Sequence, residues 1–126
     1  MKVLVVIDMQ NDFIDGSLGT PEAVSIVPNV VEKIRSWDGP VYATQDTHFA
    51  NYLETQEGKI LPVEHCIQGT GGWEIAPAVR AALAEGAQSA LYFNKTTFGS
   101  RDLAEKLAER HTEEPIEEIV LTGLCT

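Results

Sequence analysis

Two histidines and an aspartate stand at a spacing that could bind a metal ion. A single residue separates Asp46 from His48, so in an extended segment their side chains point to the same side. His65 follows a long polar stretch and supplies a second imidazole. One carboxylate and two imidazoles suit Zn²⁺, Mn²⁺ or Fe²⁺, with positions left for water or substrate. The alternative is two surface histidines near an acid, and spacing alone leaves both interpretations open.

An acid and a lysine could act together in proton transfer. Asp8 directly follows one apolar run, and Lys95 follows another. A carboxylate beside an ammonium group stays ionised and can accept a proton, while the ammonium stabilises developing negative charge. A structural ion pair is the alternative interpretation.

The turn Gly123-Leu124-Cys125-Thr126 is a third feature. A glycine-containing turn after a strand commonly holds a nucleophile and the backbone amides that bind an oxyanion. A single cysteine is also often a small buried apolar residue, so Cys125 has an ordinary structural interpretation as well.

Short apolar runs alternate with helical patterns along the chain. The predicted strands are Lys2–Ile7, Pro40–Gln45, Ala90–Phe93 and Ile116–Thr122. The predicted helices run from Pro28 to about Trp37, from Ala78 to Glu85 after Pro77, and from Ser100 to about Arg110. The order βαβαβαβ predicts a three-layer α/β/α fold with a parallel sheet.

Right-handed crossovers would bring the carboxyl ends of all these strands to one edge of the sheet. Asp8, Asp46, Lys95 and the Gly123–Thr126 turn should therefore lie together. The segment from Thr47 to about Ile75 shows little helical or strand pattern and carries two of the three histidines. Because loops of this length are usually functional or disordered, we favour a functional segment.

The composition is that of one soluble globular domain, with 126 residues, 44% apolar and 22% charged. A formal net charge of −10 repels phosphate groups, which argues against nucleic acid and anionic membranes as partners. The first apolar run is too short for a signal peptide or a spanning helix. Two cysteines without framework spacing indicate a reducing compartment, so we expect a cytoplasmic protein.

These motifs together resemble the isochorismatase-like cysteine hydrolases, and within them the nicotinamidase/pyrazinamidase branch. The resemblance covers residues 1–126. The opening Asp8-Met9-Gln10-Asn11-Asp12-Phe13 is similar to the family motif D-x-Q-x-D-F, and Lys95-Thr96-Thr97-Phe98 is similar to the catalytic-lysine segment. The metal-dependent branch is resembled by Asp46-Thr47-His48 and by His65-Cys66 followed by Gly69-Thr70. The start of the motif G-x-x-T-D-x-C is resembled by Gly123-Leu124-Cys125-Thr126.

The resemblance implies a role for each residue. Asp8 would take the proton of a nucleophilic cysteine and later help deliver it to the leaving ammonia, and Lys95 would hold Asp8 and favour the thiolate. Phe13 would line the substrate pocket and Phe98 would flank it. A divalent metal, Zn²⁺ before Mn²⁺ or Fe²⁺, would be bound by Asp46, His48 and His65, with Glu57 as a fourth ligand directly or through water.

The sequence departs from the family pattern in two places. The nucleophile is the last cysteine of G-x-x-T-D-x-C, which falls three residues beyond Thr126, so Cys125 resembles an oxyanion-hole position instead. We therefore expect a single domain over 1–126, truncated after the fourth strand and lacking the C-terminal third of the family fold. Leu61 stands in the pocket where many members carry an aromatic ring, which weakens the case for stacking of a flat pyridine and leaves a different small amide open as the substrate.

We thus expect a metal-containing amidohydrolase that converts nicotinamide or a similar small amide to acid and ammonia through a thioester. The expected partner is this small molecule, with no nucleic acid and no membrane, and a homo-oligomer stays open. One alternative is a metal-free hydrolase of the same fold that acts on an ether such as isochorismate or on a carbamoyl compound. The other is a non-catalytic binding or scaffold domain, which gains weight if the natural chain ends at Thr126.

Overall fold

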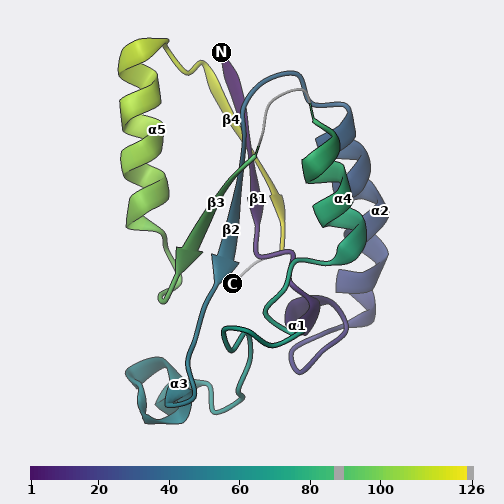
Figure 1. The fold of residues 1–126 in the computed structure, drawn as a ribbon, viewed down its shortest axis with the longest axis vertical. Helices are drawn as coiled ribbons and strands as arrows, with labels where there is room; N and C mark the ends of the chain where they lie inside the picture. Colours follow the sequence, from purple (N-terminus) through teal and green to yellow (C-terminus); the bar gives the residue numbers. More distant parts are fainter. Residues whose placement is uncertain (87–89, 125–126) are drawn as a thin grey trace.

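The computed structural model describes residues 1–86 and 90–124, which form a parallel sheet with helices on both sides. The strands are β1 (Lys2–Ile7), β2 (Val41–Asp46), β3 (Leu91–Lys95) and β4 (Glu118–Gly123), in the order β3-β2-β1-β4. Helices α2 (Pro21–Arg35) and α4 (Pro77–Glu85) cover one face, and α5 (Arg101–Glu113) lies on the other side (Figure 1). The predicted three-layer α/β/α architecture is confirmed.

Strand β1 lies at the centre of the core because it is apolar on both faces. Leu4 and Val6 belong to one hydrophobic cluster with Val30 of α2 and Val79 of α4. On the opposite face of the strand Val5 is also buried, with 2% of its surface exposed. A strand buried in this way fixes the position of the residue that follows it.

The register of the sheet brings the strand ends together. Ile7 of β1 pairs with Thr44 of β2 and with Gly123 of β4, while Asp46 pairs with Lys95 of β3. All three pairings are parallel, so the carboxyl ends of the strands meet at one edge. The expectation that chemically active residues gather at this edge therefore rests on an observed register.

Helix α2 starts earlier than its sequence pattern suggested. The Thr20 hydroxyl accepts the N–H of Ala23 at 3.0 Å, and Pro21 occupies the first turn. The prediction that Pro28 opens this helix was wrong, because Pro28 lies inside it. A threonine cap followed by proline is a strong start signal, and burial of Val30 keeps the helix going past the interior proline.

Short helical turns occupy the two polar segments that were expected to be loops. Helix α1 (Asn11–Ile14) follows β1 directly, and α3 (Gln56–Ile60) follows a 3₁₀ turn, η1 (Tyr52–Glu54). Elements of three to five residues are too short to show helical periodicity, which is why the sequence pattern did not reveal them.

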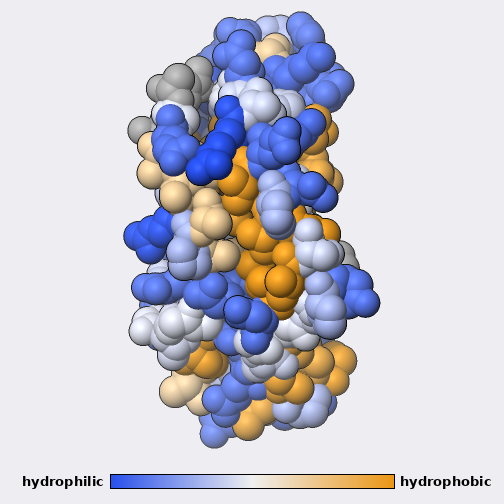
Figure 2. All heavy atoms as spheres, turned by 90° about the vertical axis from the view of Figure 1, so that its right-hand side faces the viewer, coloured by the Kyte–Doolittle hydropathy of each residue, from blue (hydrophilic) through white to orange (hydrophobic). Residues whose placement is uncertain are grey.

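The side of the molecule covered by α2 and α4 carries an apolar strip with hydrophilic borders (Figure 2). Val27, Pro28 and Val31 of α2 and Ala78 of α4 line a groove there. Helix α2 also contributes Glu32, Arg35 and Ser36 to this groove, so its lining is mixed in character. Among the described residues, no helix is long and apolar enough to cross a bilayer.

Candidate metal centre and catalytic pair

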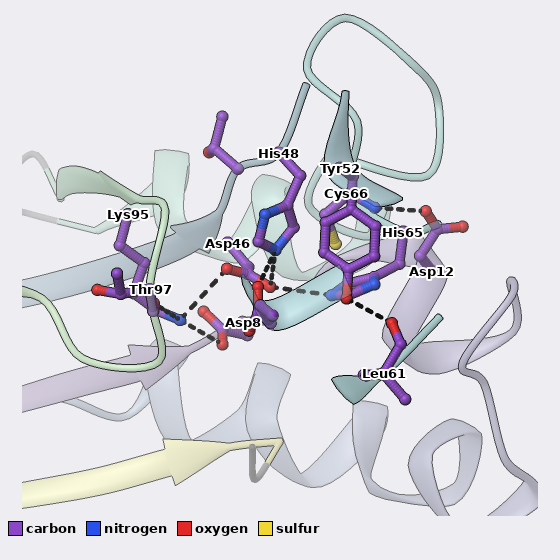
Figure 3. A network of polar contacts seen from close by, with 12 residues as sticks. Asp8, Asp12, Asp46, His48, Tyr52, Leu61, His65, Cys66, Lys95 and Thr97 are labelled. Carbon is purple, nitrogen blue, oxygen red and sulfur yellow. Dashed lines mark hydrogen bonds and ion pairs between the residues drawn. The ribbon is translucent and has the colours of Figure 1, made fainter. Parts of the chain in front are cut away.

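Asp46, His48 and His65 converge at the carboxyl edge of the sheet (Figure 3). Asp46 is the last residue of β2, and its Oδ2 lies 3.0 Å from Nε2 of His48 and 3.2 Å from Nε2 of His65. All three side chains are buried. One ligand atom from each lies within 4.8 Å of the other two. The structure therefore brings together the three residues whose spacing suggested a metal site.

Backbone pairing holds the two histidine segments side by side. The N–H of His48 donates to the carbonyl of Cys66 at 2.9 Å, and the N–H of Gln68 donates to the carbonyl of His48 at 2.8 Å. This isolated parallel bridge lies just beyond β2. It explains how histidines seventeen positions apart come to face one carboxylate.

The hydrogen bonding of His65 leaves one ring nitrogen directed at the carboxylate. Nδ1 of His65 lies 2.8 Å from the carbonyl of Val63, and a carbonyl can only accept, so Nδ1 carries a proton. In the neutral ring, Nε2 then presents a lone pair toward Asp46. A lone pair facing a carboxylate oxygen is favourable only with a proton or a cation between the two atoms. A metal-bound histidine usually has this arrangement, with its other ring nitrogen donating to a carbonyl or carboxylate.

Glu57 of α3 lies beside His48, one of the three candidate ligands. Its Oε2 lies 3.2 Å from Nε2 of His48. Within the described part of the chain, Oε2 of Glu57 and Oδ1 of Asp46 are buried oxygens without a hydrogen-bond partner. Buried carboxylate oxygens are costly unless a cation or donor compensates them. Donors about 2 Å from a tetrahedral ion lie roughly 3.3 Å from one another. The separations of 3.0 and 3.2 Å from Asp46 Oδ2 to the two histidines therefore fit a divalent metal.

The acid–base properties of the site reflect the same crowding. Burial opposes the charged form of Asp46, but the hydrogen bond from His65 and the charge of Lys95 outweigh it and lower the pKa of this carboxyl. Burial likewise acts against protonated His65, yet the hydrogen bond to Asp46 raises the pKa of that imidazole. Without a metal, the two groups therefore favour an imidazolium–carboxylate pair.

Asp8 and Lys95 form a buried ion pair next to this centre (Figure 3). The Nζ of Lys95 donates to Oδ2 of Asp8 at 3.0 Å, and the hydroxyl of Thr44 donates to Oδ1 at 2.7 Å. Lys95 Nζ also lies 3.8 Å from Oδ1 of Asp46. The expected proximity of the acid and the lysine is thus present, and the ion pair adjoins Asp46 of the candidate metal cluster.

The backbone of Asp8 adopts a left-handed conformation, with φ at 49°. Its N–H lies 3.2 Å from the hydroxyl of Thr44, within hydrogen-bond reach. A non-glycine residue in this region is uncommon and persists where its surroundings impose it, often at functional sites. Cys66 has the same φ of 49°, and its N–H donates to Oδ2 of Asp12 at 2.8 Å.

Gln10 is a structural residue of the site that sequence reasoning did not single out. Its side chain is fully buried and pairs twice with the backbone of Asp46, donating to the carbonyl and accepting the N–H, both at 2.8 Å. It also donates to the carbonyl of Trp73 at 2.8 Å. Its place in the opening motif was the only feature of the sequence that could have indicated this role, because all the contacts of its side chain are with residues distant in sequence.

A cavity of about 370 Å³ opens beside the candidate metal cluster. His48 and Glu57 belong to its lining together with Phe98, which the sequence placed in the pocket. Phe13 and Leu61 do not line this cavity. The ring centre of Phe13 lies 5.4 Å from that of His65, and the carbonyl of Leu61 accepts a hydrogen bond from Tyr52. The described cavity also gains apolar lining that was not expected, from Phe49 and Ile60.

The chain has two cysteines, Cys66 and Cys125. Cys66 is buried, and burial raises the pKa of its thiol far above the ordinary range, which makes it a poor nucleophile. Cys125, the residue expected at an oxyanion-hole position, lies outside the described residues.

Comparison with known proteins gives the family. A family model, the isochorismatase domain, matches residues 2–126. No curated protein sequence matches the chain significantly. Among solved structures, pyrazinamidase of Pyrococcus horikoshii in complex with zinc is 27% identical with a TM-score of 0.73, and the match covers 99% of this chain and 71% of that one.

Two further structures are similar. Nicotinamidase/pyrazinamidase from Bacillus subtilis is 32% identical, with a TM-score of 0.74 and coverage of 98% of this chain and 71% of that one. N-carbamoylsarcosine amidase from Thermoplasma acidophilum is 27% identical, with a TM-score of 0.70 and coverage of 97% and 66%. The chain thus spans 66% to 71% of the length of these three relatives. On the match over nearly its whole length, the chain belongs to the isochorismatase family.

Proposed function

We propose that this protein is a metal-dependent amidohydrolase that converts nicotinamide or a similar small amide to the acid and ammonia. The observation that carries the proposal is the meeting of two sites at one sheet edge. The Asp46–His48–His65 cluster lies next to the buried Asp8–Lys95 pair, with 3.8 Å between Lys95 Nζ and Asp46 Oδ1. Similarity to nicotinamidases and pyrazinamidases supports the choice of substrate.

In this proposal the cluster Asp46, His48 and His65, with Glu57, holds a divalent ion, and Zn²⁺ suits the donors best. When bound, the ion supplies a positive centre that orients a polar atom of the substrate. The three ligands of the cluster are all at least 95% buried, so little of their surface meets bulk solvent.

Asp8 serves as the general base and acid. One of its oxygens accepts from Thr44 and the other from Lys95, so the carboxylate is fixed in place. Asp8 takes the proton of a cysteine thiol, the thiolate attacks the amide carbon, and the same proton leaves with ammonia. Water then hydrolyses the thioester to the acid. The resemblance to the family motif implies a nucleophilic cysteine three residues after Thr126, and the buried thiol of Cys66 is unsuited to this role.

The test is ammonia release from nicotinamide, pyrazinamide and a small aliphatic amide, measured on protein whose intact mass is known. We expect activity that is lost on chelation and restored by Zn²⁺, that His48→Ala abolishes, and that the control His111→Ala on α5 retains. An absence of ammonia release with zinc bound, in protein whose mass shows that it includes the family position of the nucleophile, would refute the amidohydrolase. Full activity after exhaustive chelation would instead favour the metal-free alternative, for which the similarity to a carbamoylsarcosine amidase gives a reason.

A further inference from the structure

Tyr52 is buried in a part of the chain where its neighbours are exposed. It opens the 3₁₀ turn η1, and 0% of its surface is exposed, whereas Leu53 beside it is 47% exposed. The ring of Tyr52 points into the metal cluster (Figure 3). The family resemblance assigned no role to this residue, so its burial calls for another explanation.

The ring of Tyr52 contacts both metal-binding histidines. Its centre lies 4.7 Å from that of His48 and 5.1 Å from that of His65, both in edge-to-face geometry. The two imidazoles are themselves 4.8 Å apart. Aromatic pairs at such distances are attractive and have a preferred orientation. One phenol ring therefore restricts the rotation of two ligands at once.

The polar atoms of Tyr52 organise the segment that carries Glu57. The hydroxyl donates to the carbonyl of Leu61 at 2.8 Å, which closes the segment from η1 to the end of α3. The carbonyl of Tyr52 accepts from the N–H and the hydroxyl of Thr55, which caps α3. A Cβ at Gly58 would overlap this carbonyl, so α3 packs directly on it.

We propose that Tyr52 is a positioning residue of the metal centre, which holds His48, His65 and Glu57 in their converging arrangement. The inference rests on the metal site of the proposed function and adds a specific residue to it. Groups around the ligands of a metal commonly change its affinity by about 10- to 100-fold. The ring acts on the histidines, and the hydroxyl acts on Glu57 through Leu61 and α3.

The test is a double-mutant cycle on zinc affinity, measured by competition with a chromophoric chelator. Tyr52→Phe removes only the hydroxyl, and Glu57→Gln removes the fourth donor. Each single change should weaken zinc binding about tenfold. The double variant should be no weaker than either single one, because the hydroxyl acts through Glu57. Losses that multiply to about a hundredfold, or no loss in Tyr52→Phe, would overturn the inference.

A matched control and a spectroscopic measurement separate positioning from general stability. Tyr42→Phe alters a tyrosine of β2 that is equally buried and whose ring lies 6.0 Å from that of Phe93, so zinc affinity should not change. With Co²⁺ in place of zinc, Tyr52→Phe should shift the visible absorption bands as Glu57→Gln does, and unshifted bands would contradict the proposal. A wild-type protein that binds no zinc would refute the metal site itself, whereas a zinc-binding wild type with unaffected Tyr52→Phe would refute only the role of Tyr52.

Discussion

At the scale of single residues, Lys95 lies close to two buried carboxylates, those of Asp8 and Asp46. Lys95→Met would leave Asp8, which is fully buried, without its counter-ion. Removing one partner of a buried pair costs about 3–5 kcal/mol, because the remaining charge is uncompensated. We therefore expect a fall of this size in the free energy of unfolding, measured by urea denaturation of the metal-free protein.

Two further variants check the origin of this effect. Asp8→Asn combined with Lys95→Met removes both charges and should recover part of the lost stability. Lys106→Met alters an exposed ion pair with Glu109 at 3.5 Å and should cost less than about 1 kcal/mol. If the double variant is as unstable as Lys95→Met, the loss comes from packing of the lysine stem and not from the charge of Asp8.

The His65–Asp46 pair predicts how stability depends on pH when no metal is bound. The pKa of His65 is raised above its ordinary value of 6.5, so its contribution is complete below that pH and is lost as the pH rises through the raised value. The pKa of Asp46 is lowered from 3.8, so its contribution is lost as the pH falls through the lowered value. Stability should therefore be greatest between these limits.

The measurement is urea denaturation at a series of pH values in the presence of a chelator. The decline above pH 6.5 should be smaller in Asp46→Asn, which lacks the charge that favours protonated His65. It should persist in His111→Gln, a change on the surface of α5. A profile that Asp46→Asn leaves unchanged would show that another group causes the decline.

The residues of the site differed in how well they could be predicted. Asp8, Asp46 and Lys95 were predictable because they stand where buried strands end and parallel strands share an edge. His65 was predictable only as a ligand type at the end of a long segment. Gln10 and Tyr52 were not, because they act through backbone carbonyls and ring contacts that have no signature in spacing.

At the scale of elements, the turn that carries His65 depends on Gly72. A Cβ at Gly72 would overlap the carboxylate of Asp12, and that carboxylate accepts the N–H of Cys66. Since Cys66 is held at a positive φ, displacement of Asp12 would release the turn and move His65. Gly72→Ala should therefore lower both thermal stability and zinc affinity.

Gly71→Ala is the matched control for this prediction. A Cβ at Gly71 meets no atom within 4 Å, so both quantities should stay near the wild-type values. Differential scanning calorimetry and chelator competition on the two variants give the comparison. Equal behaviour of Gly71→Ala and Gly72→Ala would mean that glycine flexibility, and not the contact with Asp12, matters in this segment.

The alternation of strands and helices was predicted, while the boundaries of the elements were not. Strand β1 was identified correctly because a continuous apolar run has one natural interpretation in this fold class. The start of α2 was missed because Pro28 and Pro21 carry the same local signal, and only the Thr20 cap and burial of the helix distinguish them. Tertiary packing settled a choice that local propensity left open.

At the scale of the whole molecule, nineteen acidic residues outnumber nine basic ones. This negative net charge is compatible with our proposal that the site binds a cation. A negative field raises the local concentration of cations and disfavours anionic ligands that do not meet a bound metal. The same field adds repulsion between surface carboxylates, which a bound divalent ion reduces only near the site. The effect of the metal on stability should thus come mainly from its direct ligands.

Zinc binding should stabilise the whole fold, because its ligands join the end of β2 to the segment that follows. They also lie beside the ion pair between Asp8, which follows β1, and Lys95 of β3. A ligand present at 100 times its Kd stabilises the folded state by about 2.7 kcal/mol, which for a domain of this size raises Tm by roughly 10 °C. Thermal unfolding with zinc, and again after chelation, measures this shift. His48→Ala should abolish it, whereas His111→Ala should retain it. A Tm that zinc leaves unchanged in the wild type, at concentrations where chelator competition shows binding, would place the bound ion on the unfolded chain as well.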